Sequence, residues 1–524
     1  MLFRRNINPQ HALKGVLYKL IEMLSIFATT EYHKQLKQII GKEDRLDELV
    51  NIIDILEKRP VPSANSILIK KGEIAFPIDW YNMQPPFILP EEIELNEANL
   101  LGIVFSKLNN FEKAYFYLKK QNPSLFKELD FINRLQQGIP IGTDELASHY
   151  SPFEEYRLMH NQAILRHYTA TPENFDADKT VYFYEEAVKC APNEEYRAYT
   201  SRQLALLFID LQQAQKAVRV LESLHSPDLS KEAKNEIKQA VSQAWMQQLT
   251  VPYDTGLLKK LKNTLWEVLQ FYEQANRNAE AGLLLLDAAH IANISESFSE
   301  SLGYATRAIN IFEEEGLEEL AGNAHLRKGT LLYTWAQNGN PQFFKPAVES
   351  YQKALKIFTK ESAPNVFADI QHHLAVIFTD MPTDTKKKGL WAGVAVSSFN
   401  EALEFYTKEK YPYEYAMICN NYGNAFTKFP KAVLSDNFEK ALFYYQESLN
   451  IRTAAYPYER AITLLNFLEA SWNVSNGSGD FNEERYLDMV EKAEEVKTLV
   501  NEKDMIAEAE KHLALLNDLK QAVT

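Results

Sequence analysis

The feature that most limits how this chain can fold is an internal repeat in its C-terminal half. Residues 416–461 align with residues 368–416, and the two copies share the string Tyr-Pro-Tyr-Glu, at 411–414 and 456–459. Residues 322–361 form a third copy. A recurring segment of about 45–48 residues indicates a stack of similar units, because one unit of this size cannot bury its apolar face alone.

Each copy carries the pattern of two helices that face each other. In the second half of a copy, small and aromatic residues recur at intervals of four and three, as in Ala395, Phe399 and Ala402. This spacing places the three side chains on one helical face. In the first half, a small residue at Ala375 or Gly423 lets the paired helix approach closely. The repeat unit is therefore predicted to be a helical hairpin.

The composition supports a helix-rich folded chain and argues against several kinds of partner. Hydrophobic residues make up 46% and charged residues 24% of the 524 residues, and only 18 are glycine, which leaves few positions for tight turns. The net charge of −15 argues against nucleic acid and anionic membranes as partners, since both bind clustered Lys and Arg. Protein partners are expected instead.

The cysteines and the N-terminal residues predict a cytoplasmic protein. Cys190 and Cys419 are far apart in the sequence and indicate neither a disulfide framework nor a cysteine zinc site, which fits a reducing compartment. An apolar run near the N-terminus is interrupted by Lys19 and Glu22, so an amphipathic helix is expected there rather than an export signal. The sequence contains no uncharged apolar stretch of about 18 residues, so no transmembrane helix is expected.

The repeats resemble tetratricopeptide repeats, which are helix-turn-helix modules of about 34 residues. Here the extra residues of each unit lie between its two helices, at 337–344, 380–390 and 430–437. This long-loop form is similar to arrays that are common in bacterial proteins. The resemblance implies an all-α fold, a right-handed α-solenoid of tetratricopeptide-like helical hairpins, with a concave surface that binds a protein or peptide.

The resemblance and the prolines divide the chain into six segments. Six prolines crowd the stretch between Pro60 and Pro90, which predicts a linker where 67–69 and 74–76 form at most a short hairpin. The predicted segments are an N-terminal helical region at 1–58, a Pro-rich linker at 59–94, a tetratricopeptide-like hairpin and connector at 95–150, divergent repeats at 151–316, well-formed long-loop repeats at 317–472 and C-terminal capping helices at 473–524.

The candidate peptide- or partner-binding residues recur at one position of the first helices, which the resemblance places on the concave wall. Side-chain amides both donate and accept hydrogen bonds, so a row of them can hold the main chain of an extended peptide. The alternative is that these side chains only solvate an exposed helix face. The candidates are Arg327, His373, Asn421 and Asn466, together with Asn424 one turn beyond Asn421.

A known tetratricopeptide clamp for carboxylate ends offers a comparison for this row. Asn424 and Asn466 match the two asparagine positions of that clamp, which the resemblance supplies. Asn420 stands where the first lysine of the clamp is expected, and Leu465 and Glu469 add no positive charge. The row is therefore expected to hold peptide amide groups.

A second candidate contact lies in the inserted segment after residue 380. Lys386, Lys387 and Lys388 stand beside Gly389 and Trp391, and we expect them on an exposed turn. Lysines and a tryptophan on a loop of an acidic protein form a surface that suits the carboxylates of a partner. A plain solvated turn is the alternative.

The sequence shows no group of residues that is arranged for chemistry. His372 and His373 are adjacent, so on a helix they point about 100° apart and do not form a metal-binding pair. His160 and His167 lack the intervening Glu of a zinc helix, and Cys419 occupies an apolar packing position. We therefore expect no catalytic residue, no metal ion and no cofactor.

Together these patterns predict a non-catalytic scaffold, adaptor or regulatory subunit that binds a protein or peptide along the concave surface. Two alternatives stay open. One is a peptide-responsive switch, in which a bound peptide tightens the superhelix and changes how the N-terminal residues engage an effector. The other is an enzyme with a cryptic site in residues 1–150. The sequence gives no expectation for the oligomeric state.

Overall fold

A computed structural model describes residues 23–56, 65–80, 86–142, 146, 152–171, 174–250, 252–431, 436–474 and 481–523. The chain divides into two compact units. The N-terminal unit is the described part of 7–304 with 314–317, and the C-terminal unit is the described part of 305–313 with 318–524. None of the described helices combines the length and the apolar character that a membrane crossing requires.

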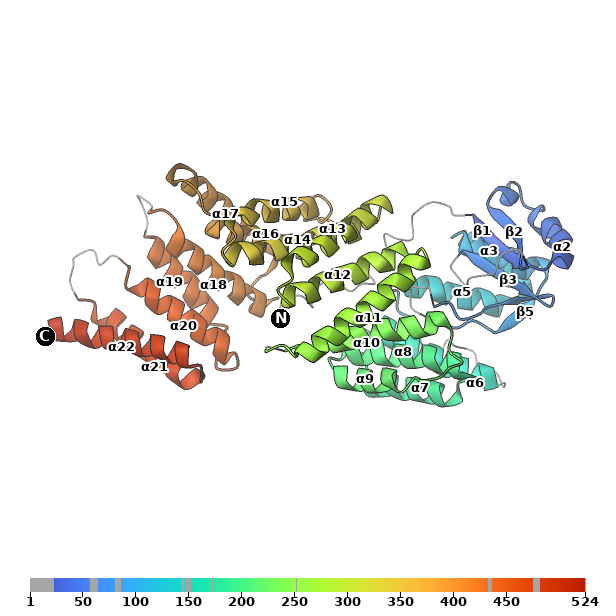
Figure 1. Ribbon diagram of the computed structural model, residues 1–524, viewed down its shortest axis with the longest axis horizontal. Helices are drawn as coiled ribbons and strands as arrows, with labels where there is room; N and C mark the ends of the chain where they lie inside the picture. Colours follow the sequence, from blue (N-terminus) through green and yellow to red (C-terminus); the bar gives the residue numbers. More distant parts are fainter. Residues whose placement is uncertain are drawn as a thin grey trace. The chain divides into compact units, whose positions relative to one another are not determined.

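The N-terminal unit begins with a five-stranded mixed sheet (Figure 1). Its strands are β1 (Leu24–Ala28), β2 (Val50–Asp54), β3 (Ser66–Lys70), β4 (Glu73–Ala75) and β5 (Glu92–Glu94). Their order in the sheet is β2-β1-β3-β4-β5, with β1 parallel to both of its neighbours and the β3–β4 and β4–β5 pairs antiparallel. Helix α2 (Thr30–Ile40) forms the crossover that the parallel β1–β2 pair requires.

This sheet corrects two of the sequence predictions. The described part of 1–58 was predicted to be helical, but it contains β1 and β2 as well as α2 and the short 3-10 helix η2 (Leu46–Glu48). The predicted linker at 59–94 contains β3, β4 and β5. The all-α prediction is therefore wrong for this part of the chain. Residues 1–22 and 57–64 lie outside the described residues.

The physical reason for the error is the length of the apolar runs. A run of four or five apolar residues fits a buried strand as well as part of a helix, and β-branched residues such as Ile26 and Ile69 favour the strand. Both side chains are buried in the core of the unit. The expected short hairpin is confirmed as β3–β4, in which Ile69 lies opposite Ile74.

Helices make up the rest of the N-terminal unit, and most pair as antiparallel hairpins, as in α3–α4, α6–α7 and α8–α9 (Figure 1). Gly102 lets the Leu118 side chain pack directly against α3, because any Cβ there would overlap it. In the second helices of two of these hairpins, Ala187 of α7 and Ala217 of α9 are fully buried. The helices are α3 (Glu97–Lys107), α4 (Phe111–Gln121), α5 (Pro123–Gln136), α6 (Pro152–Thr169), α7 (Ala177–Cys190), α8 (Glu194–Asp210), α9 (Ala214–Glu222), α10 (Lys231–Gln247), α11 (Thr255–Gln274) and α12 (Asn278–Ile294).

The C-terminal unit consists of helices. Helix α13 (Phe298–Glu314) begins in the N-terminal unit and continues into this one. Hairpins α14–α15, α16–α17 and α18–α19 correspond to the three aligned copies, and α20 with α21 and α22 follows them. The bounds are α14 (Glu318–Gln337), η4 (Pro341–Phe343), α15 (Phe344–Leu355), α16 (Pro364–Asp380), α17 (Thr385–Phe405), α18 (Pro412–Lys428), α19 (Asn437–Leu449), α20 (Pro457–Ser471), α21 (Glu483–Leu499) and α22 (Lys503–Val523).

The hairpins close on the small residues that the sequence singled out. A Cβ atom at Gly423 would lie 2.5 Å from Cε1 of Tyr445, and one at Gly329 would lie 3.0 Å from the ring of Tyr351. Both tyrosines are fully buried on the second helices. The predicted close approach of the paired helix at the small residue of the first helix is therefore confirmed, and the structure adds that an aromatic ring of the second helix makes this contact.

The prediction of a long loop at 380–390 is wrong, because α17 begins inside it. Asp384 caps this helix, with its Oδ1 accepting the backbone N–H of Lys387 at 2.9 Å. The extra residues of this repeat therefore lengthen the second helix rather than the connection.

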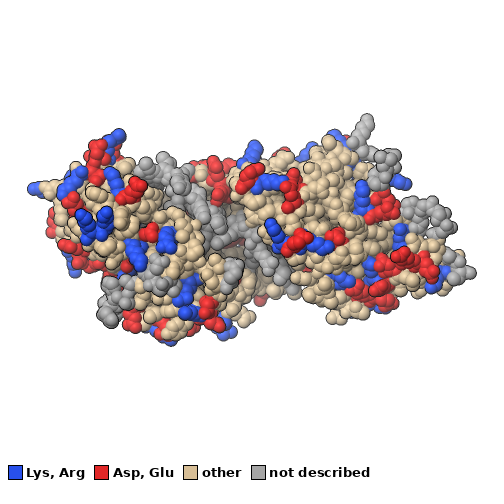
Figure 2. Space-filling view, turned by 180° about the vertical axis from the view of Figure 1, so that it is seen from behind, with Lys and Arg blue, Asp and Glu red and all other residues tan. Residues whose placement is uncertain are grey.

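Charged side chains of both signs intermingle on the face shown in Figure 2. Exposed ion pairs also join successive elements of the stack, such as Lys238 of α10 with Glu267 of α11 at 2.7 Å and Lys360, just before α16, with Glu401 of α17 at 2.9 Å. Exposed pairs of this kind contribute about 0–1 kcal/mol each, so the buried apolar contacts decide the stability of the stack.

Candidate functional site

The predicted binding residues share one place in the first helices of the C-terminal unit. Counted from the start of each helix, the tenth residue is Arg327 in α14, His373 in α16, Asn421 in α18 and Asn466 in α20. Three of these helices begin with proline, which fixes their first turn. All four side chains are half-buried, so each has one side toward the protein and one toward solvent.

Hydrogen bonds join these first helices through a row of side chains that we call the polar row: His372, Asn420, Asn421 and Asn466. The Nδ2 amide of Asn421 donates to Nε2 of His372 at 2.9 Å, which crosses from α18 to α16. Asn466 Nδ2 donates to Asn420 Oδ1 at 3.2 Å, which crosses from α20 to α18. Asn420 also approaches Asn421 at 3.5 Å. The row therefore spans three successive repeats.

His372, which belongs to the row, and His373, which lies beside it, are neutral near pH 7. Burial, together with a smaller effect of the neighbouring His373, lowers the pKa of His372 to about 3. Burial also lowers the pKa of His373 to about 4. Because His372 accepts at Nε2, its ring carries the proton at Nδ1. His373 stacks on Tyr351, with 5.4 Å between the ring centres.

The structure brings some of the predicted residues into the row and leaves others outside it. Asn421 and Asn466 belong to it, whereas Asn424 accepts a hydrogen bond from the hydroxyl of Tyr445 at 2.7 Å. Arg327 and His373 hold the expected helix position but make none of the hydrogen bonds of the row.

The predicted lysine turn corresponds to the first turns of α17. Lys387 and Lys388 are exposed there, and the side chain of Lys386 lies outside the described residues. Trp391 stacks on Phe378 of α16 at 5.1 Å between ring centres. The tryptophan therefore packs between the two helices of its hairpin and does not project from a loop.

A further polar contact ties the C-terminal ends of the first helices. Asp380, the last residue of α16, accepts hydrogen bonds from the Tyr333 hydroxyl of α14 and from Lys428 Nζ of α18, both at 2.7 Å. The positive charge of Lys428 is thus paired. Amide and neutral imidazole groups alone make up the polar row itself.

Sequence reasoning missed a third asparagine at this helix position, in the N-terminal unit. Asn161 is the tenth residue of α6, and the fully buried Ala163 follows at the place that Gly423 holds in α18. The Asn161 side chain accepts from the Ile88 N–H and donates to the Ile88 carbonyl, each at 2.8 Å. His160 Nε2 lies 2.7 Å from the Pro86 carbonyl. An extended segment of the chain is therefore held here by its main chain.

The signal for Asn161 was present in the sequence but was weak. The proline that begins α6 and the small residue two positions after the asparagine repeat the pattern of α18, where Pro412 begins the helix. This repeat matches the clear 45-residue copies poorly, so an alignment based on those copies does not include it. His372 and Asn420 were missed as members of the row because adjacent positions on a helix differ by about 100° and only coordinates show which one meets the next repeat.

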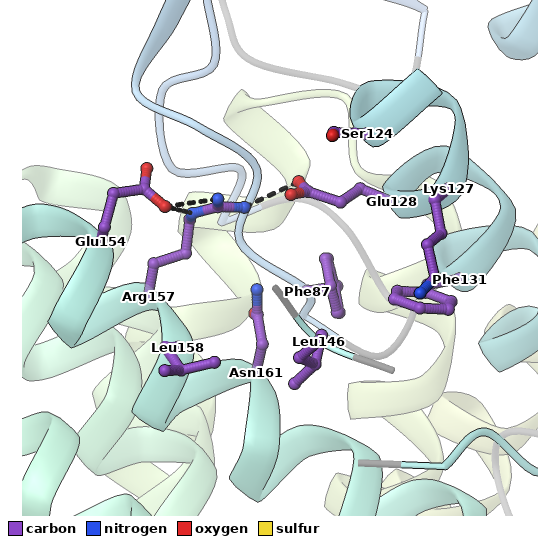
Figure 3. Close-up of a pocket in the computed structure, with 10 residues that line it drawn as sticks. All are labelled: Phe87, Ser124, Lys127, Glu128, Phe131, Leu146, Glu154, Arg157, Leu158 and Asn161. Atoms are coloured by element: carbon purple, nitrogen blue, oxygen red, sulfur yellow. Dashed lines mark hydrogen bonds and ion pairs between the residues drawn. The ribbon is translucent and has the colours of Figure 1, made fainter. Parts of the chain in front are cut away.

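A small cavity lies beside the segment that Asn161 holds (Figure 3). It has a volume of about 50 Å³ and lies between α5, α6 and Phe87. Arg157 pairs there with Glu128 at 2.7 Å and with Glu154, so its charge is neutralised. A space of this size holds one or two waters, whereas small-molecule sites take about 300–1,000 Å³.

One group of side chains has the residue types of a metal site. Donor atoms of Glu469, Glu508 and His512 lie within 4.8 Å of one another. Trp472 Nε1 donates to His512 Nδ1 at 2.9 Å, so the neutral ring carries its proton at Nε2, the nitrogen nearer Glu508. Metal binding at Nε2 would require loss of that proton, and these residues therefore do not fit a metal ion.

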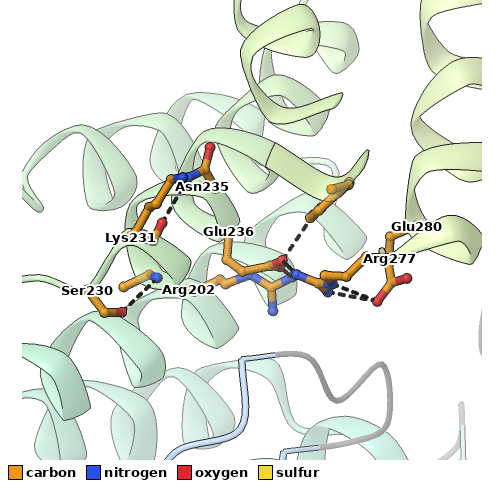
Figure 4. Close-up of polar contacts among 9 residues, drawn as sticks. Arg202, Ser230, Lys231, Asn235, Glu236, Arg277 and Glu280 are labelled. Carbon is orange, nitrogen blue, oxygen red and sulfur yellow. Dashed lines mark hydrogen bonds and ion pairs between the residues drawn. The ribbon is translucent and has the colours of Figure 1, made fainter. Parts of the chain in front are cut away.

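A buried ion network joins four helices of the N-terminal unit (Figure 4). Glu236 of α10 accepts from Arg202 of α8 at 2.9 Å and from Arg277, just before α12, at 2.6 Å. The Tyr272 hydroxyl of α11 donates to the same carboxylate at 3.0 Å, and Arg277 also pairs with Glu280. Two cations and two carboxylates balance, which indicates a structural network rather than a charged binding site.

The buried cysteine carries no chemistry of its own. Cys419 is fully buried, as predicted, and burial raises the pKa of its thiol to about 12. A thiol with this pKa is almost entirely protonated near pH 7 and is a weak nucleophile.

Comparison with known proteins gives matches to helical-repeat proteins. The model of the family "Soluble NSF attachment protein, SNAP" matches residues 258–421, from within α11 to within α18. No curated protein matches the chain. Among solved structures, it is similar to a Signal Transduction ATPase with Numerous Domains from Pyrococcus horikoshii that has a tetratricopeptide repeat sensor, with 15% identity over 95% of this chain and 82% of that chain and a TM-score of 0.47.

Two other solved structures have lower TM-scores. A Rap protein complexed with competence and sporulation factor is 13% identical over 69% of this chain and 98% of that chain, with a TM-score of 0.39. Yeast Tom70 is 11% identical over 80% of this chain and 96% of that chain, with a TM-score of 0.23. Likenesses at this level say nothing of function. The aligned hairpins of α14 to α19 are tetratricopeptide-type repeats, as the sequence resemblance implied, and in α14–α15 and α18–α19 a glycine packs against a buried tyrosine.

Proposed function

We propose that the chain is a protein-binding scaffold or regulatory subunit that holds an extended segment of a partner along the polar row. The partner's main chain meets the row, and its amide groups pair with the side-chain amides of Asn421 and Asn466. This mode needs no charge on either side, which agrees with the neutral histidines and the paired Lys428.

The observation that supports this proposal most is the hydrogen bonding of Asn161. At the same helix position as Asn421, it pairs with both the N–H and the carbonyl of one residue in an extended segment. The chain thus already contains an example of the chemistry that we propose for the C-terminal unit. Each amide of the row also keeps a free bonding capacity, since an asparagine offers two N–H donors and two acceptor lone pairs.

The test compares two double variants of the full chain in affinity purification from the native organism. Asn421→Ala with Asn466→Ala removes both amides. We expect the binding free energy to weaken by about 1 kcal/mol for each hydrogen bond lost, which corresponds to a tenfold or greater loss of partner affinity. The matched control is Asn450→Ala with Asn473→Ala, which changes two exposed asparagines outside the row.

The captured partner is then titrated against each variant by calorimetry. Binding that weakens only in the row variant supports the proposal. Equal affinity of both variants and the unchanged chain would contradict it, provided that circular dichroism shows the same helix content in all three.

A further inference from the structure

The connection between β4 and β5 leaves the sheet and crosses the first helices of the N-terminal unit. The two strands pair as neighbours, with Ala75 opposite Glu92, so the connection departs and returns at the same end of the sheet. In between, Trp80 and Pro86–Ile88 contact α6 and α8. We call the described part of this connection, residues 76–80 and 86–91, the strap.

The strap is held through its main chain at one point and through its side chains at others. Asn161 bonds both backbone groups of Ile88, and His160 donates to the Pro86 carbonyl. The Ile88 side chain is only 8% exposed, and Phe87 meets the ring of Phe131 at 6.1 Å between centres. The contact thus suits an extended, uncharged segment with proline, aromatic and aliphatic residues.

A second anchor holds the other arm of the strap. Trp80 is 7% exposed, and its ring meets that of Tyr199 edge-on at 5.0 Å. Its Nε1 donates to Glu195 Oε1 of α8 at 2.7 Å. Glu195 is itself fixed by Ser230, whose backbone N–H donates to Oε2 at 3.0 Å.

The groups that hold the strap are positioned by the repeats and not by the strap itself. The Pro86 carbonyl only accepts, so His160 carries its proton at Nε2, and its Nδ1 accepts from the Thr200 hydroxyl at 2.9 Å. The Tyr156 hydroxyl lies 2.8 Å from Thr200 Oγ1 and 3.1 Å from the Tyr196 carbonyl oxygen. These residues lie on α6 and α8, so the face keeps its donors and acceptors when the strap leaves.

We propose that this face of α6 and α8 is a second peptide-binding site, filled here by the strap as an intramolecular ligand. Its external ligand is an extended, uncharged segment of the Pro–aromatic–aliphatic type, which binds by replacing Pro86–Ile88. This site is separate from the polar row of the C-terminal unit and does not depend on the function proposed for that row.

The tether between the strap and the face sets the strength of this competition. A segment on a short connection competes at an effective concentration of about 1 mM, so an external peptide with the same contacts binds the unchanged chain only weakly. When the strap is disabled, the same peptide no longer competes with it. The apparent affinity of the peptide then rises in proportion to the share of the face that the strap had occupied.

The main experiment uses a full-chain variant with a disabled strap, Pro86→Gly, Phe87→Ser and Ile88→Gly. The probe is a fluorescein-labelled peptide with the sequence of residues 86–91, Pro-Phe-Ile-Leu-Pro-Glu, followed by fluorescence anisotropy. We expect at least tenfold tighter binding to the disabled-strap variant than to the unchanged chain. A folded disabled-strap variant that does not bind the peptide would overturn the proposal.

Two further variants in the disabled-strap background locate the bound peptide. Asn161→Ala should weaken peptide binding tenfold or more, and so should a peptide that is N-methylated at its isoleucine, because each removes a hydrogen bond to the main chain. Asn421→Ala with Asn466→Ala should leave peptide binding unchanged. Loss of binding in this last variant would place the peptide on the polar row and overturn the second site.

If the disabled-strap variant does not fold, a measurement on the chain with its strap intact tests the proposal instead. 4-Fluorophenylalanine at position 87 reports by fluorine NMR whether the ring lies against Phe131. Addition of about 5 mM of the unlabelled peptide should shift part of the signal to the position of a solvated ring, since this exceeds the effective concentration of the strap. An unchanged spectrum at this peptide concentration would overturn the proposal.

Discussion

In the proposed function, neutral side chains of the polar row take the place of the charged ones in a carboxylate clamp. Asn421 and His372 join α18 to α16 without either carrying charge. A neutral amide resembles the peptide group in size and in its paired donor and acceptor, so it binds main chain wherever it lies along a partner. A partner's terminal carboxylate, in contrast, would find no unpaired cation among the four members of the row. The proposed binding mode therefore favours an internal segment of a partner.

His372 should stay unprotonated far below the pH at which an ordinary histidine titrates. Its pKa is lowered from 6.5 to about 3 by burial and by His373, with the ring of Phe399 close by. Nitrogen-15 NMR of the imidazole should show an unprotonated Nε2 and a protonated Nδ1 down to about pH 5. A titration midpoint near 6.5 would contradict both the burial and the hydrogen bond from Asn421.

The same shift makes stability depend on pH. Between pH 6.5 and about 3 the unfolded chain binds a proton at His372 that the folded chain does not. The free energy of unfolding should therefore fall as the pH is lowered through this window, by up to about 1.4 kcal/mol per pH unit for this group. Urea unfolding at several pH values, compared with a His372→Gln variant, measures this contribution. An identical slope in the two proteins would contradict it.

Gly423 is the residue whose substitution should most directly open a repeat. A Cβ there would lie 2.5 Å from the Tyr445 ring, which is fully buried and has no room to move aside. We expect Gly423→Ala to lower the free energy of unfolding by about 1–3 kcal/mol. Gly393→Ala is the matched control, because a Cβ on that helical glycine of α17 meets nothing within 4 Å and should raise stability by about 0.5–1 kcal/mol. Chemical denaturation of both variants decides the matter, and a Gly423→Ala chain as stable as the control would contradict the packing.

The residue scale also shows what the sequence can predict about the site. The repeat period placed Asn421 and Asn466 at one helix position, and both take part in the row. The period could not tell that His372 and Asn420, one position earlier, supply the partners, because that choice depends on how far each helix is rotated against the next. Asn161 was not predicted, because the segment that it holds lies about seventy residues earlier in the chain and no local sequence pattern connects the two.

Among the elements, the long repetitive helices were predictable and the short strands were not. Hairpins such as α18–α19 repeat small and aromatic positions over many turns, and each turn adds to the signal. Strand β1 has five residues and β5 has three, so neither shows more than one or two periods of the two-residue alternation that marks a strand. Pro77, Pro86 and Pro90 suggested a linker, but in the structure they lie in the strap, where their stiffness suits an extended segment.

Helix α17 offers a prediction at this scale, since its start was misplaced as a loop. Asp384 accepts the backbone N–H of Lys387 and so satisfies one of the unpaired donors of the first turn. Asp384→Ala should cost about 1 kcal/mol of stability and speed hydrogen exchange of the backbone amides in the first turn of α17. Asp384→Asn, which keeps an acceptor oxygen, is the control and should behave like the unchanged chain. Equal exchange in the alanine variant would show that the helix does not begin here.

For the whole molecule, the division into two units follows from where the cores lie. One core joins the sheet to α3, α4 and α5, and another joins the helices from α16 to α22. Most contacts in a repeat array link each helix to its neighbours in sequence, so a local loss of stability spreads over adjacent repeats and then fades. A lesion in one unit should thus leave distant repeats of the other intact.

The buried network around Glu236 allows this expectation to be tested. Arg277→Ala leaves the Glu236 carboxylate, which is 4% exposed, without its nearest cation and should lower the free energy of unfolding of the N-terminal unit by about 3–5 kcal/mol. Hydrogen exchange followed by mass spectrometry should show faster exchange in α8, α10, α11 and α12 and unchanged exchange in α18 and α20. Arg45→Ala, which removes a pair whose arginine is 73% exposed, is the control and should leave the stability nearly unchanged. Faster exchange in α18 and α20 of the Arg277→Ala chain would mean that the two units unfold as one cooperative body, and the network would then stabilise the entire array rather than four helices of it.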